Sequence, residues 1–246
     1  MKIGIAQKTG GLSAAISAFC AILCTALLVS GCSTARMALP PSFPAETAPM
    51  QVSGHRGFGR TLRFGQYEIR NISRGWRTTS SWRIDIYGGA TSSRKSSFEV
   101  LNTASGEKTQ ARCVNNAKWQ DLKDNVLGGE LTWRFAGGVV YLAALERGEK
   151  RWELIMEQDN RGWMLEGRLS DSKTSLAVRG TRRLEGSSWE FTEATGYIFS
   201  MNGRDVAAVE TLNEGRIWVD AALSEELKDI ISASSVALLL YGDLRE

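Results

Sequence analysis

The sequence predicts a mainly β fold, in which an antiparallel meander forms a sandwich or a barrel-like sheet and one helix lies near the C-terminus. Short segments that alternate apolar and polar residues recur along the chain, as in strands with one buried face. Glycine and asparagine residues separate these segments and supply the positive φ angles of tight hairpin turns. One segment, residues 224–233, has the apolar spacing of an amphipathic helix.

Five segments carry the clearest alternation. Their apolar positions are Trp82, Ile84 and Ile86; Leu131, Trp133 and Phe135; Trp152, Leu154 and Met156; Trp189 and Phe191; and Ile217 and Val219. Turn signals lie at residues 88–89, 128–129, 137–138, 147–148, 160–162, 202–203 and 213–215. This spacing predicts roughly ten or more strands. The recurring Trp-x-apolar pattern, which also includes Trp163, favours a repeated core position over an aromatic platform for sugars or bases.

The C-terminal region predicts a helix followed by a buried strand. Ser224 suits a helix N-cap, and Glu225 and Glu226 suit the positive end of the helix dipole. One face is apolar and consists of Leu223, Leu227, Ile230 and Ile231. Residues 235–241 (SVALLLY) are apolar on both faces, so they predict a buried final strand that the helix covers.

The first 31 residues have the pattern of a secretory signal peptide. Lys2 and Lys8 are the only charged residues before Arg36, and residues 12–28 contain no charge, proline or glycine. A basic start, an apolar middle and small residues at the end define such a leader. An uncleaved membrane helix is the alternative, because about 20 apolar residues can span a bilayer. Both interpretations place the rest of the chain outside the cytoplasm.

The end of this leader resembles the lipobox of bacterial lipoproteins. The lipobox pattern, an apolar residue, two small residues and a cysteine, is matched by Val29, Ser30, Gly31 and Cys32. The resemblance implies cleavage before Cys32, a diacylglycerol on its thiol and an acyl chain on its new α-amine. Two or more acyl chains hold a protein stably at a membrane. In a Gram-negative envelope, serine rather than aspartate at position 33 favours the outer membrane, with the protein facing the periplasm.

The chain after the leader divides into a tether and one domain. Residues 32–50 contain all four prolines and predict an extended, lipid-anchored tether. Residues 51–246 contain no proline and are long enough for a single β-rich domain with its own core. Without Lys2 and Lys8, 28 basic residues face 27 acidic ones, so the charge does not favour a nucleic-acid partner. Cys113 lies in an alternating segment and is expected to be buried.

Residues able to support catalysis or metal binding are sparse. His55 is the one histidine, so no Ser-His-Asp or Cys-His arrangement is available without it. We therefore predict no catalytic residue, no metal site and no cofactor. Glu153 and Glu157 are the candidates for a carboxylate-based hydrolase. A candidate binding patch for anionic glycans or lipid headgroups combines arginines with tryptophans: Arg70, Arg74, Trp76, Arg77, Trp82 and Arg83. The alternative, which the pattern favours, is that the arginine stems cover exposed tryptophans on an outer face of the sheet.

The anchor, the tether and the sparse chemistry together predict a non-enzymatic lipoprotein of the cell envelope. Its β-domain is expected to interact with an envelope protein or to take part in envelope assembly. Two alternatives stay open at the level of the sequence. The first is a barrel or sandwich that binds an apolar ligand or a glycan, and the second is an envelope hydrolase that uses carboxylates.

Overall fold

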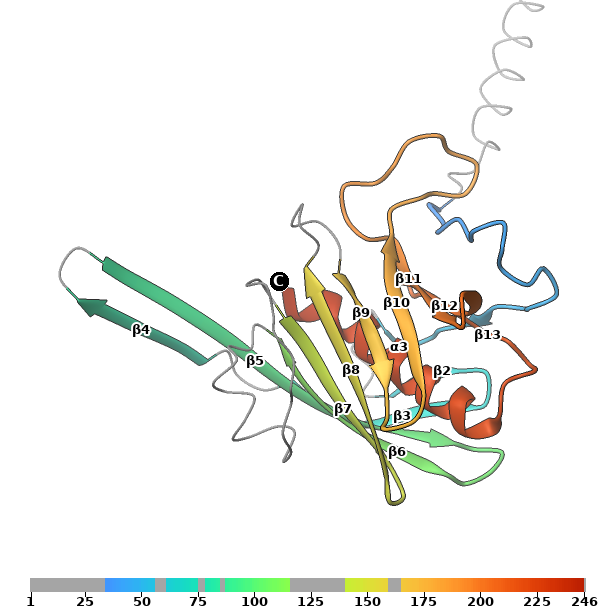
Figure 1. Cartoon of the computed structure of the whole chain (residues 1–246), viewed down its shortest axis with the longest axis horizontal. Coiled ribbons are helices and arrows are strands. Elements are labelled where there is room, and N and C mark those ends of the chain that lie inside the picture. The colour runs from blue at the N-terminus through green and yellow to red at the C-terminus, as the bar shows by residue number, and fades with distance from the viewer. Residues whose placement is uncertain are drawn as a thin grey trace, which may run out of the picture. The chain divides into compact units, whose positions relative to one another are not determined.

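The computed structural model describes residues 34–55, 61–74, 78–84, 87–115, 140–158 and 165–245. In these ranges, antiparallel strands form one nearly closed, barrel-like sheet, and one helix, α3 (Glu225–Arg245), follows them at the C-terminus (Figure 1). The mainly antiparallel β fold with a C-terminal helix is thereby confirmed. The predicted strand at residues 131–135 and the tryptophan at position 163 lie outside the described residues.

The strands form a meander. They are β1 (Met50–Gln51), β2 (Leu62–Phe64), β3 (Tyr67–Arg74), β4 (Thr78–Ile84), β5 (Tyr87–Asn102), β6 (Lys108–Asn115), β7 (Val140–Arg147), β8 (Lys150–Gln158), β9 (Leu165–Ser170), β10 (Ser175–Thr181), β11 (Gly196–Met201), β12 (Arg204–Glu210) and β13 (Arg216–Val219). The sheet order is β1-β13-β12-β11-β10-β9-β8-β7-β6-β5-β3-β2, with β4 paired to β5. Positive φ angles at Gly148, Asn202 and Gly203 confirm two of the predicted turns.

A short N-terminal segment brings the two ends of this sheet together. Met50 and Gln51 of β1 pair with β13. Two residues further on, the Ser53 amide donates to the Arg63 carbonyl at 2.9 Å, and the Arg63 amide donates back to the Ser53 carbonyl at 3.0 Å. Residues 50–53 therefore hydrogen-bond both β13 and β2. This pairing covers strand edges that would otherwise be open to association.

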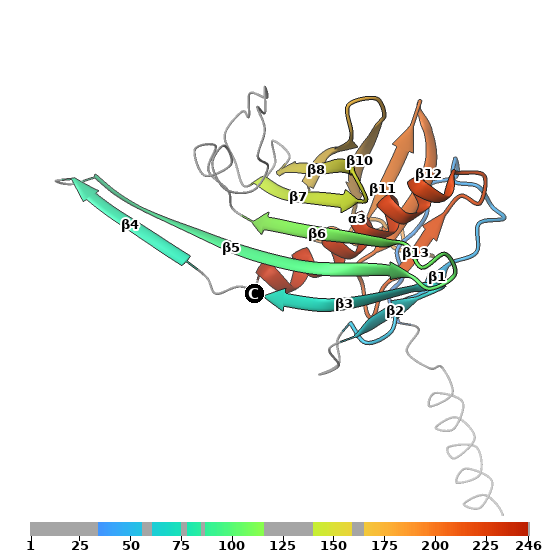
Figure 2. The ribbon, with the colours of Figure 1, turned by 90° about the horizontal axis from the view of Figure 1, so that it is seen from below.

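The helix α3 fills the concave side of the sheet, and the strands curve around it in Figures 1 and 2. Residues 229–241 are all buried. Trp152, Leu154 and Met156 of β8 are buried in the same core cluster, which confirms the inward face predicted for that strand. The Tyr141 hydroxyl of β7 donates to the Ala237 carbonyl at 2.7 Å. The interior of the described sheet is thus occupied by the chain itself.

The predicted final strand at residues 235–241 is wrong, because α3 continues through this segment. The helix begins as expected, with the Leu227 amide donating to the Ser224 hydroxyl at 3.4 Å and two glutamates in the first turn. Sheet surrounds its second half, and an enclosed helix is apolar on all faces. Such a segment has no polar side from which a helical or a strand period could be recognised. The burial was predicted correctly, and the secondary structure was not.

One hairpin extends beyond the barrel. From Arg94 onward, β5 pairs with β6, whereas residues 87–93 pair with β4 alone. Residues 88 and 89, expected to form a turn, belong to this pairing, opposite Arg83 and Trp82. Figures 1 and 2 both show β4 and the start of β5 projecting away from the other strands as a two-stranded ribbon. A two-stranded ribbon is only marginally stable by itself in water.

Candidate functional site

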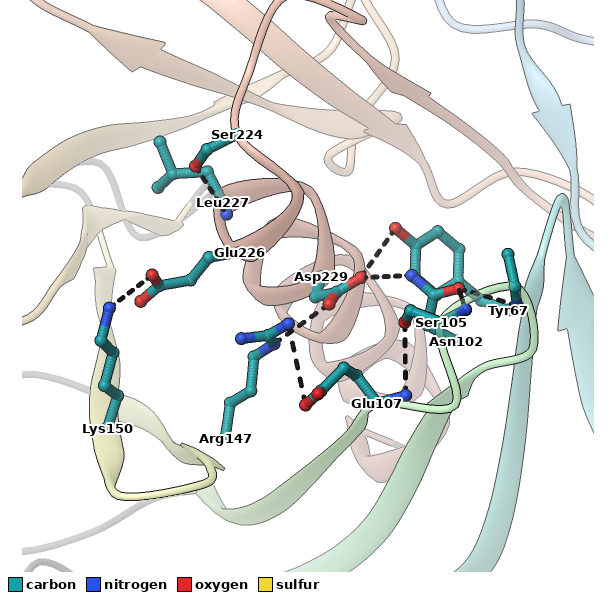
Figure 3. Close-up of polar contacts among 11 residues, drawn as sticks. Tyr67, Asn102, Ser105, Glu107, Arg147, Lys150, Ser224, Glu226, Leu227 and Asp229 are labelled. Atoms are coloured by element: carbon teal, nitrogen blue, oxygen red, sulfur yellow. Dashed lines mark hydrogen bonds and ion pairs between the residues drawn. The ribbon is translucent and has the colours of Figure 1, made fainter.

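The most elaborate buried polar cluster lies around Asp229, in the second turn of α3, and we call it the Asp229 cluster (Figure 3). Asp229 is 3% exposed. Its Oδ1 accepts hydrogen bonds from the Tyr67 hydroxyl at 3.1 Å and from Asn102 Nδ2 at 2.8 Å. Its Oδ2 accepts from Arg147 Nε at 3.0 Å. Side chains from β3, β5 and β7 therefore meet one carboxylate of the helix.

The Asp229 cluster is a structural clamp. Both carboxylate oxygens accept hydrogen bonds, one of them from a guanidinium, and all three donors lie on strands that surround the helix. Burial, together with the nearby Asp229 charge, raises the pKa of Tyr67 to about 12, so this phenol stays protonated and donates. The cluster ties α3 to three separate strands.

A second polar site holds the N-terminal segment, residues 36–43, on the outside of β11, β12 and β13. The Met37 amide donates to Glu210 Oε1 at 2.7 Å, and Arg216 Nε donates to Glu210 Oε2 at 2.6 Å. Glu210 itself is fully buried. Met37 and Phe43 are buried in a small cluster that caps outward-facing apolar side chains: Ile198, Ala208 and Trp218.

This packing corrects the expected extended tether, since residues 36–43 belong to the folded unit. The strands underneath are apolar on their outer side as well, as the nearly continuous burial of β11 and β12 shows. An apolar outer face needs a cover. Met37 and Phe43 supply that cover. They are six residues apart and belong to no alternating or helical pattern, so the sequence did not predict that they are buried. Only Ser33 and Thr34 lie between Cys32 and Ala35, the first residue of the folded unit.

Asp205 reinforces the attachment of the N-terminal segment. The Arg179 guanidinium donates to Asp205 with both terminal nitrogens, at 2.9 and 3.1 Å, while the Ser42 hydroxyl donates at 2.7 Å and the Ser200 hydroxyl at 2.6 Å. The Arg179 hydrogen bonds, supported by those of the two serines, lower the pKa of Asp205 to about 2. The Asp205 carboxylate is 5% exposed and the Arg179 side chain is 44% exposed, so solvent screens this pairing in part.

We expect Asp205→Asn to destabilise the protein by about 2 kcal/mol at neutral pH, because a carboxyl pKa that folding lowers by about two units contributes that much. The contribution is present above pH 4 and is lost as the pH falls toward 2, since the unfolded group then binds a proton more readily than the folded one. Urea unfolding at pH 7 and pH 2 measures this. The exposed Glu193→Gln serves as control. A loss for Asp205→Asn that is equal at both pH values would contradict the assignment.

A third feature is the loop formed by residues 182–194, between β10 and β11, which we call the aromatic loop. Trp189 is 82% exposed and Phe191 is 41% exposed, so the strand and the core position predicted there are both wrong. The predicted alternation spans three residues, and the structure pairs only one of them, Glu190, in an isolated bridge with Arg183. No neighbouring strand therefore buries one side of this segment.

The aromatic loop is bound to the N-terminal segment. Met37 forms an antiparallel bridge with Leu184. The Ala38 amide donates to the Arg183 carbonyl at 3.0 Å, and the Glu185 amide donates to the Arg36 carbonyl at 2.8 Å. Figure 1 shows this loop, in orange, reaching past the end of β10 beside the blue N-terminal segment.

The predicted arginine–tryptophan patch and the lipidation motif lie mainly outside the residues and side chains that the structure describes. Arg70 is exposed on β3 and its Nε donates to Glu68 at 2.7 Å. For Arg74 in β3, and for Trp82 and Arg83 in β4, the structure describes the backbone alone. Trp76 and Arg77 lie outside the described residues. The same is true of Cys32 and of its cleavage motif, Val29, Ser30 and Gly31. Cys113 is buried as predicted, and burial raises the pKa of its thiol to about 11.

Glu153 and Glu157 are not arranged as a catalytic pair. Both alternate with the inward residues of β8, so they lie four residues apart on its outer face. At about 3.3 Å per residue that separates them by about 13 Å. The two carboxyl groups of glycosidases are roughly 5 to 9.5 Å apart. Glu153 instead lies 3.4 Å from Arg151 Nε, and Glu157 is paired across the strands with Glu166.

Among the described residues, no cluster of histidine, cysteine, aspartate and glutamate side chains is suited to hold a metal ion. None of the helices found in these ranges has both the length and the apolar character required to cross a bilayer. Comparison with protein-family models, with curated proteins and with solved structures gives no match for this chain.

Proposed function

We propose that the protein is a lipid-anchored, non-enzymatic lipoprotein of the cell envelope that presents its β-domain to an envelope protein. The observation that carries the proposal is Cys32, which ends a basic and then apolar leader in a lipobox-like motif. In an envelope with two membranes, Ser33 favours the outer membrane and a domain that faces the periplasm.

Two features of the fold support binding of a protein over binding of an apolar ligand. The concave side of the sheet is filled by α3, whose residues 229–241 are buried, so a ligand inside the barrel has to displace part of the core. The projecting ribbon of β4 and β5 has backbone groups that no strand of the described sheet pairs on its outer edge. An extended segment of a partner adds readily to such an edge through main-chain hydrogen bonds.

Mass spectrometry of the protein from its native membrane tests the anchor. We expect a chain that begins at Cys32 and carries the mass of a diacylglycerol and an acyl chain. Cys32→Ser should remove this mass, and Cys113→Ser, which changes the buried thiol of the barrel, should leave it in place. A chain that keeps Met1, or one that lacks added hydrocarbon, would overturn the lipoprotein assignment.

Photo-crosslinking in living cells tests the partner. A photoreactive residue at Ser80, in the ribbon, should capture an envelope protein, whereas the same residue at Ser172, an exposed position in the turn between β9 and β10, should not. Replacing residues 76–93 by an Asn-Gly turn, which closes hairpins tightly, should abolish capture while acylation of Cys32 persists. Equal capture at the two positions, or none at Ser80, would count against the ribbon as the binding element.

A further inference from the structure

The aromatic loop exposes two large aromatic side chains close together, and this pair needs an explanation. Isolated exposed apolar residues are ordinary on protein surfaces. Here, however, a tryptophan and a phenylalanine lie two residues apart, 82% and 41% exposed, and no other large apolar side chain of the described residues is exposed to this degree. Tryptophan is enriched at the level of the lipid headgroups in membrane proteins, and phenylalanine occurs with it on the apolar faces of helices that lie in the membrane interface.

The loop is held close to the point where the chain leaves the fold. Asn213 Nδ2 donates to the Ala35 carbonyl at 2.8 Å. The next two residues bind the loop: the Arg36 carbonyl accepts from the Glu185 amide, and Met37 forms the bridge with Leu184. Only Ser33 and Thr34 lie between Cys32 and Ala35, so this stretch spans at most about 10 Å. A lipid on Cys32 therefore holds the aromatic loop within reach of the bilayer surface.

We propose that the aromatic loop inserts Trp189 and Phe191 into the interface of the lipid bilayer, as a second membrane contact beside the acyl anchor. This inference rests on the proposed acylation of Cys32. The partner is the phospholipid surface itself, because the fold ties the loop to the short link that ends at the anchor. Insertion fixes which end of the barrel faces the membrane and leaves the turn between β9 and β10, at the opposite end of β10, away from it.

The charges of the loop show which force drives the contact. Arg182 and Arg183 are accompanied by Glu185, Glu190 and Glu193, and Arg182 forms an ion pair with Glu190. Two cations against three anions give no net attraction to anionic headgroups. Burial of the aromatic rings is therefore the driving force, and insertion should be the same in neutral and in anionic membranes.

The test places a fluorophore at one of two positions that flank β10, in the mature, acylated protein. Ser188→Cys lies in the aromatic loop, and the control Ser172→Cys lies in the turn at the other end of β10; both positions are exposed. With the Cys32 sulfur acylated and Cys113 1% exposed, the introduced cysteine is the one that reacts with an environment-sensitive label. The protein is then reconstituted in phosphatidylcholine vesicles.

We expect a blue-shifted emission at Ser188→Cys and quenching by acyl-chain-brominated lipids several-fold stronger than at Ser172→Cys. The same shift should occur when part of the lipid is phosphatidylglycerol. Adding Trp189→Ser and Phe191→Ser should return the emission at Ser188→Cys to that of water, while the protein stays vesicle-bound through its lipid.

Three results would overturn the inference. Water-like emission at Ser188→Cys in acylated, vesicle-bound protein refutes loop insertion and leaves the lipoprotein assignment intact. A shift that requires envelope extract instead of lipid assigns the loop to a protein partner. Absence of acyl mass on Cys32 refutes the proposed function, and this inference with it.

Discussion

Asp229→Ala should destabilise the protein by about 3–5 kcal/mol, the cost of breaking a buried charge pair from one side. The substitution leaves the Arg147 guanidinium without its nearest carboxylate, and it removes the acceptor of Tyr67 and of Asn102. Urea unfolding at neutral pH, followed by circular dichroism, measures the loss.

The control for this substitution lies on the same two elements. Lys150 and Glu226 also join the β7–β8 hairpin to α3 by an ion pair, but their side chains are 61% and 25% exposed. Exposed pairs contribute about 1 kcal/mol or less, so Glu226→Ala should cost little. The double substitution Asp229→Leu with Arg147→Met should recover part of the stability, because it removes both partners of the ion pair together. If Asp229→Ala costs no more than Glu226→Ala, the Asp229 cluster does not clamp the helix.

Substituting each of the three consecutive leucines Leu238, Leu239 and Leu240 by alanine should cost about 2–5 kcal/mol in every case. Successive helix positions point about 100° apart, so these three side chains cover most of the circumference of α3. All three are at most 3% exposed, and Leu239 packs so closely that a Cβ added to Gly215 would lie 2.8 Å from its Cδ2. The free energy of unfolding of each variant provides the measurement.

This series distinguishes a helix enclosed by the sheet from one that merely covers it. A helix lying on a surface turns at least one of three successive residues toward solvent, where truncation to alanine is nearly neutral. Leu227→Ala, at the half-buried start of α3, is the internal comparison and should cost less than any of the three. A near-zero effect at Leu238, Leu239 or Leu240 would contradict the enclosed helix.

The predictions from the sequence were most accurate for features that depend on residues close together in the chain. In β8, the alternation of Trp152, Leu154 and Met156 marks the buried face, and the same three side chains lie in the core. The turn at Asn202 and Gly203 follows from their tolerance of positive φ, and the helix start follows from the capping chemistry of Ser224. These features depend on neighbouring residues in the chain, so they can be predicted from the sequence alone.

The candidate sites could not be found in this way. The Asp229 cluster joins Tyr67, Asn102, Arg147 and Asp229, which are spread over more than half of the chain and share no motif. Nothing local distinguishes these four residues from other polar residues. They become a site only when the curvature of the sheet brings three strands around the first turns of α3.

By itself, the sequence determined the β-rich class, the inward face of strands such as β8, the start of the C-terminal helix and the expectation of an anchor at Cys32. The tertiary structure decided that residues 235–241 are helical, that residues 36–43 cover the outside of the sheet and that Trp189 is exposed. The physical reason is that apolar residues specify burial, whereas the surface against which they are buried is created by segments distant in the chain.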